Sequence, residues 1–199
     1  MKIGILAYQG SFEEHFHHLR LAMSSSETQG EVLPVRKLND IKVIDGIIIP
    51  GGESTTLGVL MRRMGILDEL REVIRSGLPV FGTCAGAIML AKESADAKVK
   101  MEQPLLGVMD MAVVRNYYGR QRESFQETID ATSIGAGKVL VPFIRAPVIS
   151  KVWGPTEILV QLEGRPVMVR EGNALATIFH PELSSTPSFH GYFLRLVKR

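Results

Sequence analysis

The chain has 199 residues, 23 of them Lys or Arg and 21 Asp or Glu, which gives a net charge of +2. This balance argues against a nucleic-acid-binding face, and no apolar run approaches the ~20 residues that a membrane span needs. The single cysteine excludes an internal disulfide and favours a reducing compartment, so we expect a cytoplasmic protein. The length predicts one domain spanning 1–199.

Apolar runs alternate with helical patterns in the first part of the chain. Strands are predicted at 2–8, 31–36, 45–50 and 78–81. Apolar residues at helical spacing predict helices over 12–23, over 57–75 with an interruption at Gly65, and over 85–89. Residues 2–8 are too short for a signal peptide and are expected to form the first strand.

The last part of the chain has a different pattern. Short strands are predicted at 157–162, 166–170 and 174–180, with spacings that suit antiparallel hairpins. A closing helix is expected from Phe189, and a mobile surface loop is expected at 93–104. The sequence therefore predicts an α/β fold whose mostly parallel sheet has helices on both faces and ends in an antiparallel strand section.

The only cysteine, Cys84, lies between Gly82 and Gly86, directly after an apolar strand and before a helical pattern. This arrangement is typical of a nucleophile elbow, in which glycines permit a sharp strand-to-helix turn. The N-terminus of the following helix favours the thiolate form of the cysteine. The alternative is a small buried thiol with no chemical role.

A cysteine nucleophile needs a base and a group that orients the base, and His180-Pro181-Glu182 offers both. At the end of a strand, residues two apart point to the same side, so Glu182 can hold the His180 ring. A histidine packed beside an ordinary loop glutamate is the alternative. Together with Cys84, these residues predict a Cys-His-Glu triad.

Gly51-Gly52 follows the third predicted strand, and ligands of open α/β sheets bind beyond such strand ends. Two interpretations of this turn remain open. One is an anion cradle, although the lysine of a P-loop is absent. The other is an oxyanion hole that pairs a Gly51 or Gly52 N–H with the Ala85 N–H. We expect either Ser54 or Thr55 to cap the helix that follows.

The remaining histidines give weaker signals. His15, His17 and His18 lie on the first predicted helix, but no second cluster of ligands supports a metal site. A solvated or capping role is expected for them, and His190 is expected to be structural. No metal and no cofactor is predicted.

Several stretches together resemble class I glutamine amidotransferases. Three of them carry the likeness to the class as a whole: 50–54, 82–86 and 179–183. The further stretches 8–10, 14–15, 115–121 and 143–147 are similar to the glutaminase subunits of pyridoxal 5'-phosphate synthases. The resemblance covers essentially the whole chain. It departs from the family at Tyr117-Tyr118, which puts the shape of the neighbouring pocket in question.

The resemblance implies a flavodoxin-like, three-layer glutamine amidotransferase fold and a hydrolysis of L-glutamine through a glutamyl thioester. Cys84 would be the nucleophile, His180 the base and Glu182 its orienting partner. Gly52 and Ala85 would supply the oxyanion hole. The residues that would hold glutamine are Gly52, Glu53, Ser54, Arg115, Ile144 and Arg145. The ammonia would pass to a pyridoxal 5'-phosphate synthase subunit in a hetero-oligomer, with no nucleic acid or membrane involved.

Two other functions compete with this one. A cysteine-dependent amidase or deglycase on the same kind of sheet would attack a different carbonyl and need no partner. A flavodoxin-like binding module would use the Gly51-Gly52 turn for a phosphate, without thiol chemistry. The presence of His180 and Glu182 argues against the binding module.

Overall fold

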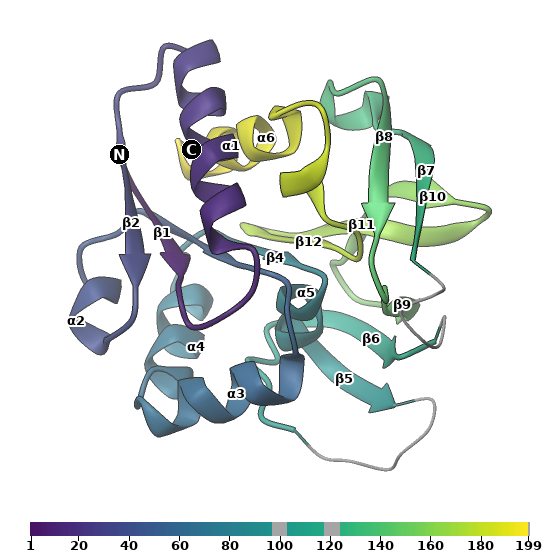
Figure 1. Cartoon of the computed structure of the whole chain (residues 1–199). Coiled ribbons are helices and arrows are strands. Elements are labelled where there is room, and N and C mark those ends of the chain that lie inside the picture. Colours follow the sequence, from purple (N-terminus) through teal and green to yellow (C-terminus); the bar gives the residue numbers. More distant parts are fainter. Residues whose placement is uncertain (97–102, 118–123, 199) are drawn as a thin grey trace.

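The computed structural model describes residues 1–96, 103–117 and 124–198. Its main sheet is built from seven strands: β1 (Lys2–Leu6), β2 (Glu31–Val35), β3 (Gly46–Ile49), β4 (Val80–Thr83), β10 (Glu157–Leu162), β11 (Arg165–Glu171) and β12 (Ala174–Thr177). Their order is β10-β11-β12-β4-β3-β1-β2 (Figure 1). The pairs from β2 to β12 are parallel, and β12-β11-β10 are antiparallel. The predicted mostly parallel sheet with an antiparallel C-terminal section is confirmed.

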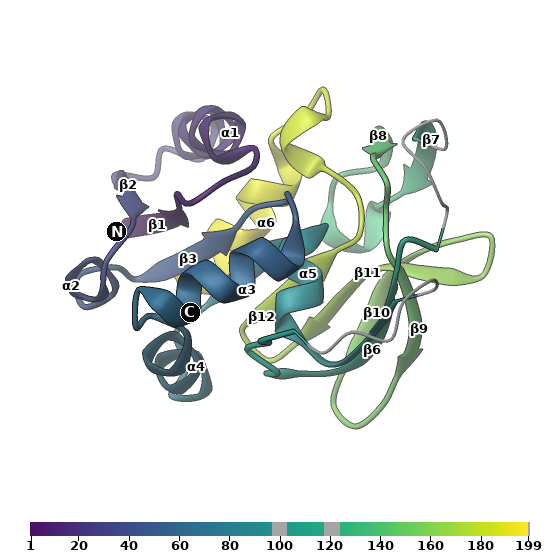
Figure 2. The same cartoon turned by 60° about the horizontal axis from the view of Figure 1, so that its bottom comes forward.

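Helices cover both faces of this sheet. They are α1 (Phe12–Ser25), α2 (Leu38–Ile41), α3 (Ser54–Arg63), α4 (Leu67–Arg75), α5 (Ala85–Leu90) and α6 (Ser188–Val197), with 3-10 turns η2 (Thr132–Ile134) and η3 (Pro181–Leu183). In Figures 1 and 2, α1 and α6 lie on one face, and α3, α4 and α5 lie on the other. Because both faces are covered, the strand β3 is buried along its whole length, as its unbroken apolar run requires.

A second layer of strands lies beside the main sheet and was not predicted. β5 (Ala91–Asp96), β6 (Met109–Arg115) and β9 (Val148–Val152) form a three-stranded sheet, and β7 (Phe125–Asp130) pairs with β8 (Lys138–Phe143). The surface loop expected at 93–104 is therefore wrong at its start, where β5 continues to Asp96. Residues 97–102 of that loop lie outside the described residues.

Two predicted elements end earlier than the periodicity suggested. The helix over 57–75 is two helices, because Gly65 takes a left-handed conformation (φ 69°) that ends α3. The strand at 174–180 ends at Thr177, so His180 lies beyond the strand at the start of η3. Within the described part of the chain, no helix is long and apolar enough to cross a membrane.

Candidate active site

A pocket of about 390 Å³ opens at the edge of the main sheet where parallel strands end. It contains Cys84, His180 and every residue predicted to hold glutamine. Its lining consists of Gly52, Glu53, Ser54, Cys84, Ile88, Arg115, Asn116, Ile144, Arg145, Pro147 and His180. Ala85 and Glu182 do not line it. Of the predicted Arg115–Gln121 stretch, only residues 115–117 are described, and Tyr117 is exposed outside this pocket.

Cys84 adopts a strained backbone conformation, with φ 50° and ψ −103°, between β4 and α5. The flanking glycines serve a purpose other than the turn angle, since neither has a positive φ. A Cβ atom on Gly86 would lie 1.9 Å from the carbonyl oxygen of Ile49, and one on Gly82 would lie 2.6 Å from the Gly86 backbone. The glycines therefore let α5 pack directly on β3 and β4, which fixes the elbow.

The register of the sheet brings His180 to Cys84. β12 pairs in parallel with β4 so that Thr177 lies opposite Thr83, and both strands end at the same edge. The His180 N–H donates to the carbonyl oxygen of Pro142 at 3.0 Å, which holds the backbone beyond the strand. His180 and Cys84 line the same pocket, and Gly51 lies against both side chains, so the two are close neighbours.

Glu182 holds the other side of the His180 ring. His180 Nδ1 and Glu182 Oε1 are 2.7 Å apart, and a carboxylate only accepts, so Nδ1 carries the proton. Nε2 is thereby left free toward the thiol. The two residues meet through η3 rather than through the strand alternation expected from the sequence, because the strand has already ended at Thr177.

These contacts set the charges of His180 and Glu182. Burial disfavours the imidazolium of His180, but the neighbouring Cys84 and Glu182 outweigh it and raise the pKa of His180. Burial likewise disfavours the Glu182 carboxylate, yet the facing His15, His180 and Ser11 lower the pKa of Glu182. The arrangement thus keeps Glu182 ionised and stabilises the imidazolium that forms when His180 takes a proton.

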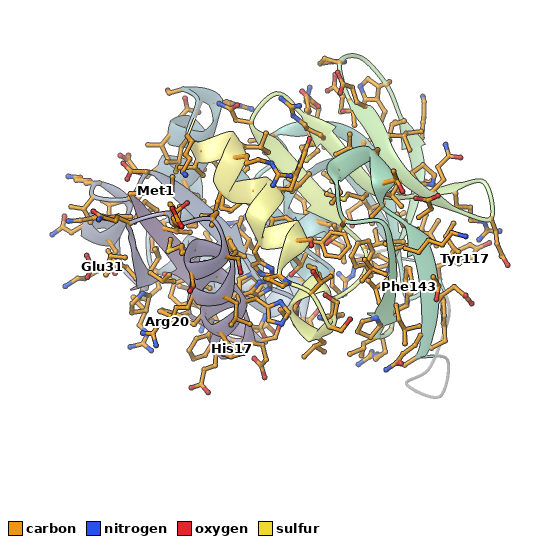
Figure 3. All side chains as sticks on the ribbon, turned by 90° about the horizontal axis from the view of Figure 1, so that it is seen from above. Met1, His17, Arg20, Glu31, Tyr117 and Phe143 are labelled. Atoms are coloured by element: carbon orange, nitrogen blue, oxygen red, sulfur yellow. The ribbon has the colours of Figure 1, made fainter. Side chains whose placement is uncertain are left out.

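The carboxylate of Glu182 also has partners on the first helix. Ser11 Oγ donates to Glu182 Oε1, and His15 Nε2 lies 3.4 Å from Glu182 Oε2. The expected solvated role is wrong for His15 and His18, which are buried, whereas His17 is exposed. Figure 3 shows His17 on the outer side of α1. The hydrophobic stripe of α1 faces α6 and the sheet, and His15 and His18 fall on that side.

Glu53, rather than Ser54 or Thr55, caps α3. Its carboxylate accepts the backbone N–H groups of Thr55 at 3.0 Å and Thr56 at 2.6 Å. Burial opposes ionisation of this carboxyl, but the hydrogen bonds from Thr56 and Thr55 prevail and lower the pKa of Glu53 to about 2. The predicted capping role of Ser54 or Thr55 is therefore wrong, since the N-cap position lies one residue earlier.

Arg115 extends from β6 to the N-terminus of α3. Its guanidinium donates to Thr55 Oγ1 at 2.8 Å and to Glu53 Oε1 at 3.2 Å, and it also donates to Gln103 Oε1. Gln103 Oε1 accepts from Ser54 Oγ and Thr55 Oγ1 as well, each at 3.1 Å. Sequence analysis missed Gln103, because no motif marks it and its partners lie on β6 and α3.

The segment between β8 and β9 forms the opposite wall of the pocket. The carbonyl oxygen of Ile144 lies 3.9 Å from Cys84 Sγ. Arg145 follows with a left-handed backbone (φ 46°), and its N–H donates to Ser124 Oγ at 3.3 Å. This wall therefore contributes both a polar backbone group beside the thiol and a second cationic side chain.

Gly51 and Gly52 complete the wall on the β3 side. A Cβ atom on Gly51 would lie 2.5 Å from His180 Cε1 and 3.4 Å from Cys84 Cβ, so only glycine fits between them. Gly52 has a φ of 137°, and the Gln9 side chain packs against it while Gln9 Nε2 donates to the carbonyl oxygen of Glu53 at 2.6 Å. Backbone groups of the glycine pair therefore reach the reactive side chains directly.

The chain matches a known protein family over nearly its whole length. The model of the "SNO glutamine amidotransferase family" matches residues 5–199. The chain belongs to the SNO glutamine amidotransferase family. It is accordingly a glutaminase, an enzyme of the hydrolase class.

Among the described residues, no three His, Cys, Asp or Glu side chains are arranged to hold a metal ion.

Similar proteins match over the full length of the chain. A protein of Saccharolobus islandicus is 62% identical over 199 residues, and proteins of Saccharolobus solfataricus and Sulfurisphaera tokodaii are 59% and 56% identical, each with full coverage of both chains. All three are named pyridoxal 5'-phosphate synthase subunit PdxT. A crystal structure of a glutamine amidotransferase has a TM-score of 0.85 at 44% identity and 99% coverage of both chains. A Thermotoga maritima glutamine amidotransferase, at 14% identity and a TM-score of 0.63 over 92% of this chain and 76% of its own, shares the fold.

Proposed function

We propose that this chain hydrolyses L-glutamine with Cys84 as the nucleophile, His180 as the general base and Glu182 as the group that orients His180. The observation that carries this proposal is the 2.7 Å hydrogen bond between His180 Nδ1 and Glu182 Oε1, behind a pocket that Cys84 and His180 line together. That bond leaves His180 Nε2 as the atom able to take a proton from the thiol.

The proposed reaction has two halves. His180 Nε2 takes the thiol proton of Cys84, and the thiolate attacks the side-chain amide carbon of glutamine. His180 returns the proton to the amide nitrogen as the C–N bond breaks, which releases ammonia and leaves a glutamyl thioester. A water molecule then gives a proton to His180 and attacks the thioester carbon, and the departing sulfur recovers that proton as glutamate leaves.

The N–H groups of Gly52 and Ala85 are proposed to bind the oxyanion that forms in each half. Ala85 is the first residue of α5, where backbone N–H groups have no partner within the helix. The carbonyl oxygen of Gly51 lies against Gly10, on the β1 side of β3. In a trans peptide the N–H points the opposite way, so the Gly52 N–H points away from Gly10, which supports the proposal.

Glutamine is proposed to bind through the polar groups of the pocket. Arg115 and Arg145 supply positive charge for the α-carboxylate, for which a guanidinium fork is well suited. Backbone and side-chain oxygens at Gly52, Glu53 and Ser54 suit the α-ammonium group. The carbonyl oxygen of Ile144 lies 3.9 Å from the thiol, so Ile144 would contact the amide end of the substrate.

The names of the similar proteins indicate where the ammonia goes. Each is a subunit of pyridoxal 5'-phosphate synthase. We therefore propose that this chain assembles with a synthase subunit in a hetero-oligomer and delivers ammonia to it for pyridoxal 5'-phosphate biosynthesis. A free catalytic thiol also suits a reducing compartment, so we propose the cytoplasm as its location.

The test measures glutamate release from glutamine, with and without the synthase subunit, for the wild-type chain and the Cys84→Ala variant. The expected result is hydrolysis by the wild type, stimulated by the synthase, and none by the variant. Undiminished glutamate release by Cys84→Ala would overturn the proposal. Labelling with a diazo-ketone analogue of glutamine separates the amidase alternative, because a glutamine-specific adduct on Cys84 is expected only of a glutaminase.

A further inference from the structure

Buried histidines lie behind the proposed triad and have no part in the reaction described above. His15 and His190 are fully buried, and His18 is nearly so. A buried imidazole must be hydrogen-bonded to offset the loss of hydration. His15 contacts more residues than are needed to satisfy the hydrogen bonds of one imidazole ring.

His15 joins three segments of the chain around the active site. Its Nε2 atom lies 3.1 Å from Thr83 Oγ1, next to the nucleophile, and 3.4 Å from Glu182 Oε2. Its Nδ1 atom lies 2.8 Å from His190 Nε2 on α6. Glu182 Oε2 is buried and has no hydrogen-bond partner among the described residues, and His15 Nε2 lies against it at 3.4 Å.

The negative charge of Glu182 determines which ring nitrogens of His15 and His190 carry a proton. A lone pair on His15 Nε2 would face the negative charge of the Glu182 carboxylate, so the tautomer with the proton on Nε2 is favoured. Burial lowers the pKa of His15 to about 4, so the ring is neutral and its Nδ1 carries a lone pair. His190 Nε2–H therefore donates to His15 Nδ1. Burial also lowers the pKa of His190, which fits a neutral ring.

We propose that His15 is a positioning residue, whose Nε2–H holds the Glu182 carboxylate in the rotamer that aligns His180 while His190 anchors the His15 ring. This inference rests on the proposed triad. Ser11 and His180 both bind Glu182 Oε1 and leave the other oxygen free to rotate. His15 removes that freedom, and through Thr83 it ties the orienting carboxylate to the strand that carries Cys84.

The competing explanation is that His15 only fills space between α1 and α6. The two explanations differ in which variant restores function. Gln places its amide nitrogen near the position of His Nε2, so His15→Gln keeps a donor toward Glu182. His15→Phe keeps the ring volume and loses the donor. His18→Phe is the matched control, because His18 is a buried histidine on the same helix and, among the described residues, makes no hydrogen bond or ion pair with Glu182 or Thr83.

The experiment measures kcat and KM for glutamine in the complex with the synthase subunit, after thermal unfolding has established the folded fraction of each variant. His15→Phe is expected to lower kcat about tenfold to a hundredfold with KM unchanged, as loss of an orienting partner does elsewhere. His15→Gln is expected to have most of the wild-type kcat, and His18→Phe is expected to have the wild-type kcat.

Proton NMR of the isolated chain supplies a readout that packing alone does not move. The His180 Nδ1–H bonded to Glu182 gives a far-downfield resonance, assigned by its loss in Glu182→Gln. The resonance is expected to broaden in His15→Phe and to persist in His15→Gln and His18→Phe. If His15→Phe keeps both the resonance and kcat, or if His15→Gln is as impaired as His15→Phe, the positioning role is wrong. If Cys84→Ala is active in the same assay, the proposed triad itself is wrong, so the two failures are distinguishable.

Discussion

Gly86, on the helix behind Cys84, lies against the carbonyl oxygen of Ile49 at the end of β3, with no space for a side chain between them. The turn that carries Cys84 therefore depends on the absence of a Cβ atom at this position.

The first prediction concerns this close approach. Gly86→Ala would set a Cβ atom 1.9 Å from a backbone oxygen, so α5 must shift, and we expect a loss of at least about 1–3 kcal/mol in the free energy of unfolding. Gly191→Ala is the control within α6, where the nearest atom is the flexible end of Arg195 at 3.9 Å. That change is expected to be neutral or stabilising by up to about 1 kcal/mol. Urea unfolding measures both, and equal stability of the two variants would contradict the prediction.

The second prediction concerns the strained backbone of Cys84. With φ 50° and ψ −103°, the backbone at this position is strained for any residue that has a Cβ atom. Glycine relieves this strain, whereas alanine does not. Cys84→Gly is expected to be more stable than Cys84→Ala by about 1 kcal/mol or more, although both lack the thiol. Denaturant midpoints of the two variants test this, and the prediction fails if Cys84→Ala unfolds at the same midpoint or later.

The third prediction concerns glutamine affinity. Arg115→Ala removes a guanidinium from the pocket and is expected to raise KM for glutamine about tenfold to a hundredfold, with a smaller effect on kcat. Gln103→Ala keeps the positive charge of Arg115 but removes one hydrogen-bond acceptor that positions its guanidinium group, so a smaller rise in KM is expected. Arg75→Ala, on the surface of α4, is the control. An unchanged KM in Arg115→Ala would remove this residue from the binding site.

The fourth prediction concerns stability in acid. His15 has a folded-state pKa of about 4, below its ordinary value of 6.5, so the unfolded chain binds more protons between these values. Its contribution to stability is full above pH 6.5 and is lost as the pH falls toward 4, by up to about 3 kcal/mol. His180, whose pKa is raised, is largely protonated in both states over this window and adds little slope. Unfolding of His15→Gln is expected to depend less on pH than that of the wild type, and parallel curves would contradict the assignment.

Sequence patterns predicted the parts of this molecule that local chemistry determines. Apolar runs located every strand of the main sheet, and the setting of Cys84 located the elbow. The strands from β5 to β9 were missed, because they are half-exposed and because β6 pairs with β9 across a long stretch of chain. Periodicity carries no signal for such pairing.

In the candidate site, too, the sequence predicted some features and missed those that depend on distant parts of the chain. Glu53 was expected in the pocket, but its capping role was not, since a Ser and two Thr follow it directly and have the better intrinsic preference for caps. His15 was expected to have a solvated or capping role. Its burial depends on α6, which follows more than 170 residues later and supplies His190.

The pairing of β12 with β4 brings His180 to Cys84, and β8 adds one contact, the hydrogen bond from the His180 N–H to the Pro142 carbonyl oxygen. The second layer and the loops beside it supply Arg115, Ile144 and Arg145 to the pocket. The groups proposed to break the bond and those proposed to select the substrate thus lie mostly on different parts of the chain. Exchanges at Arg115 or Arg145 can therefore alter which amide is accepted, whereas a one-residue slip in β12 would displace His180 and disable the enzyme for every substrate.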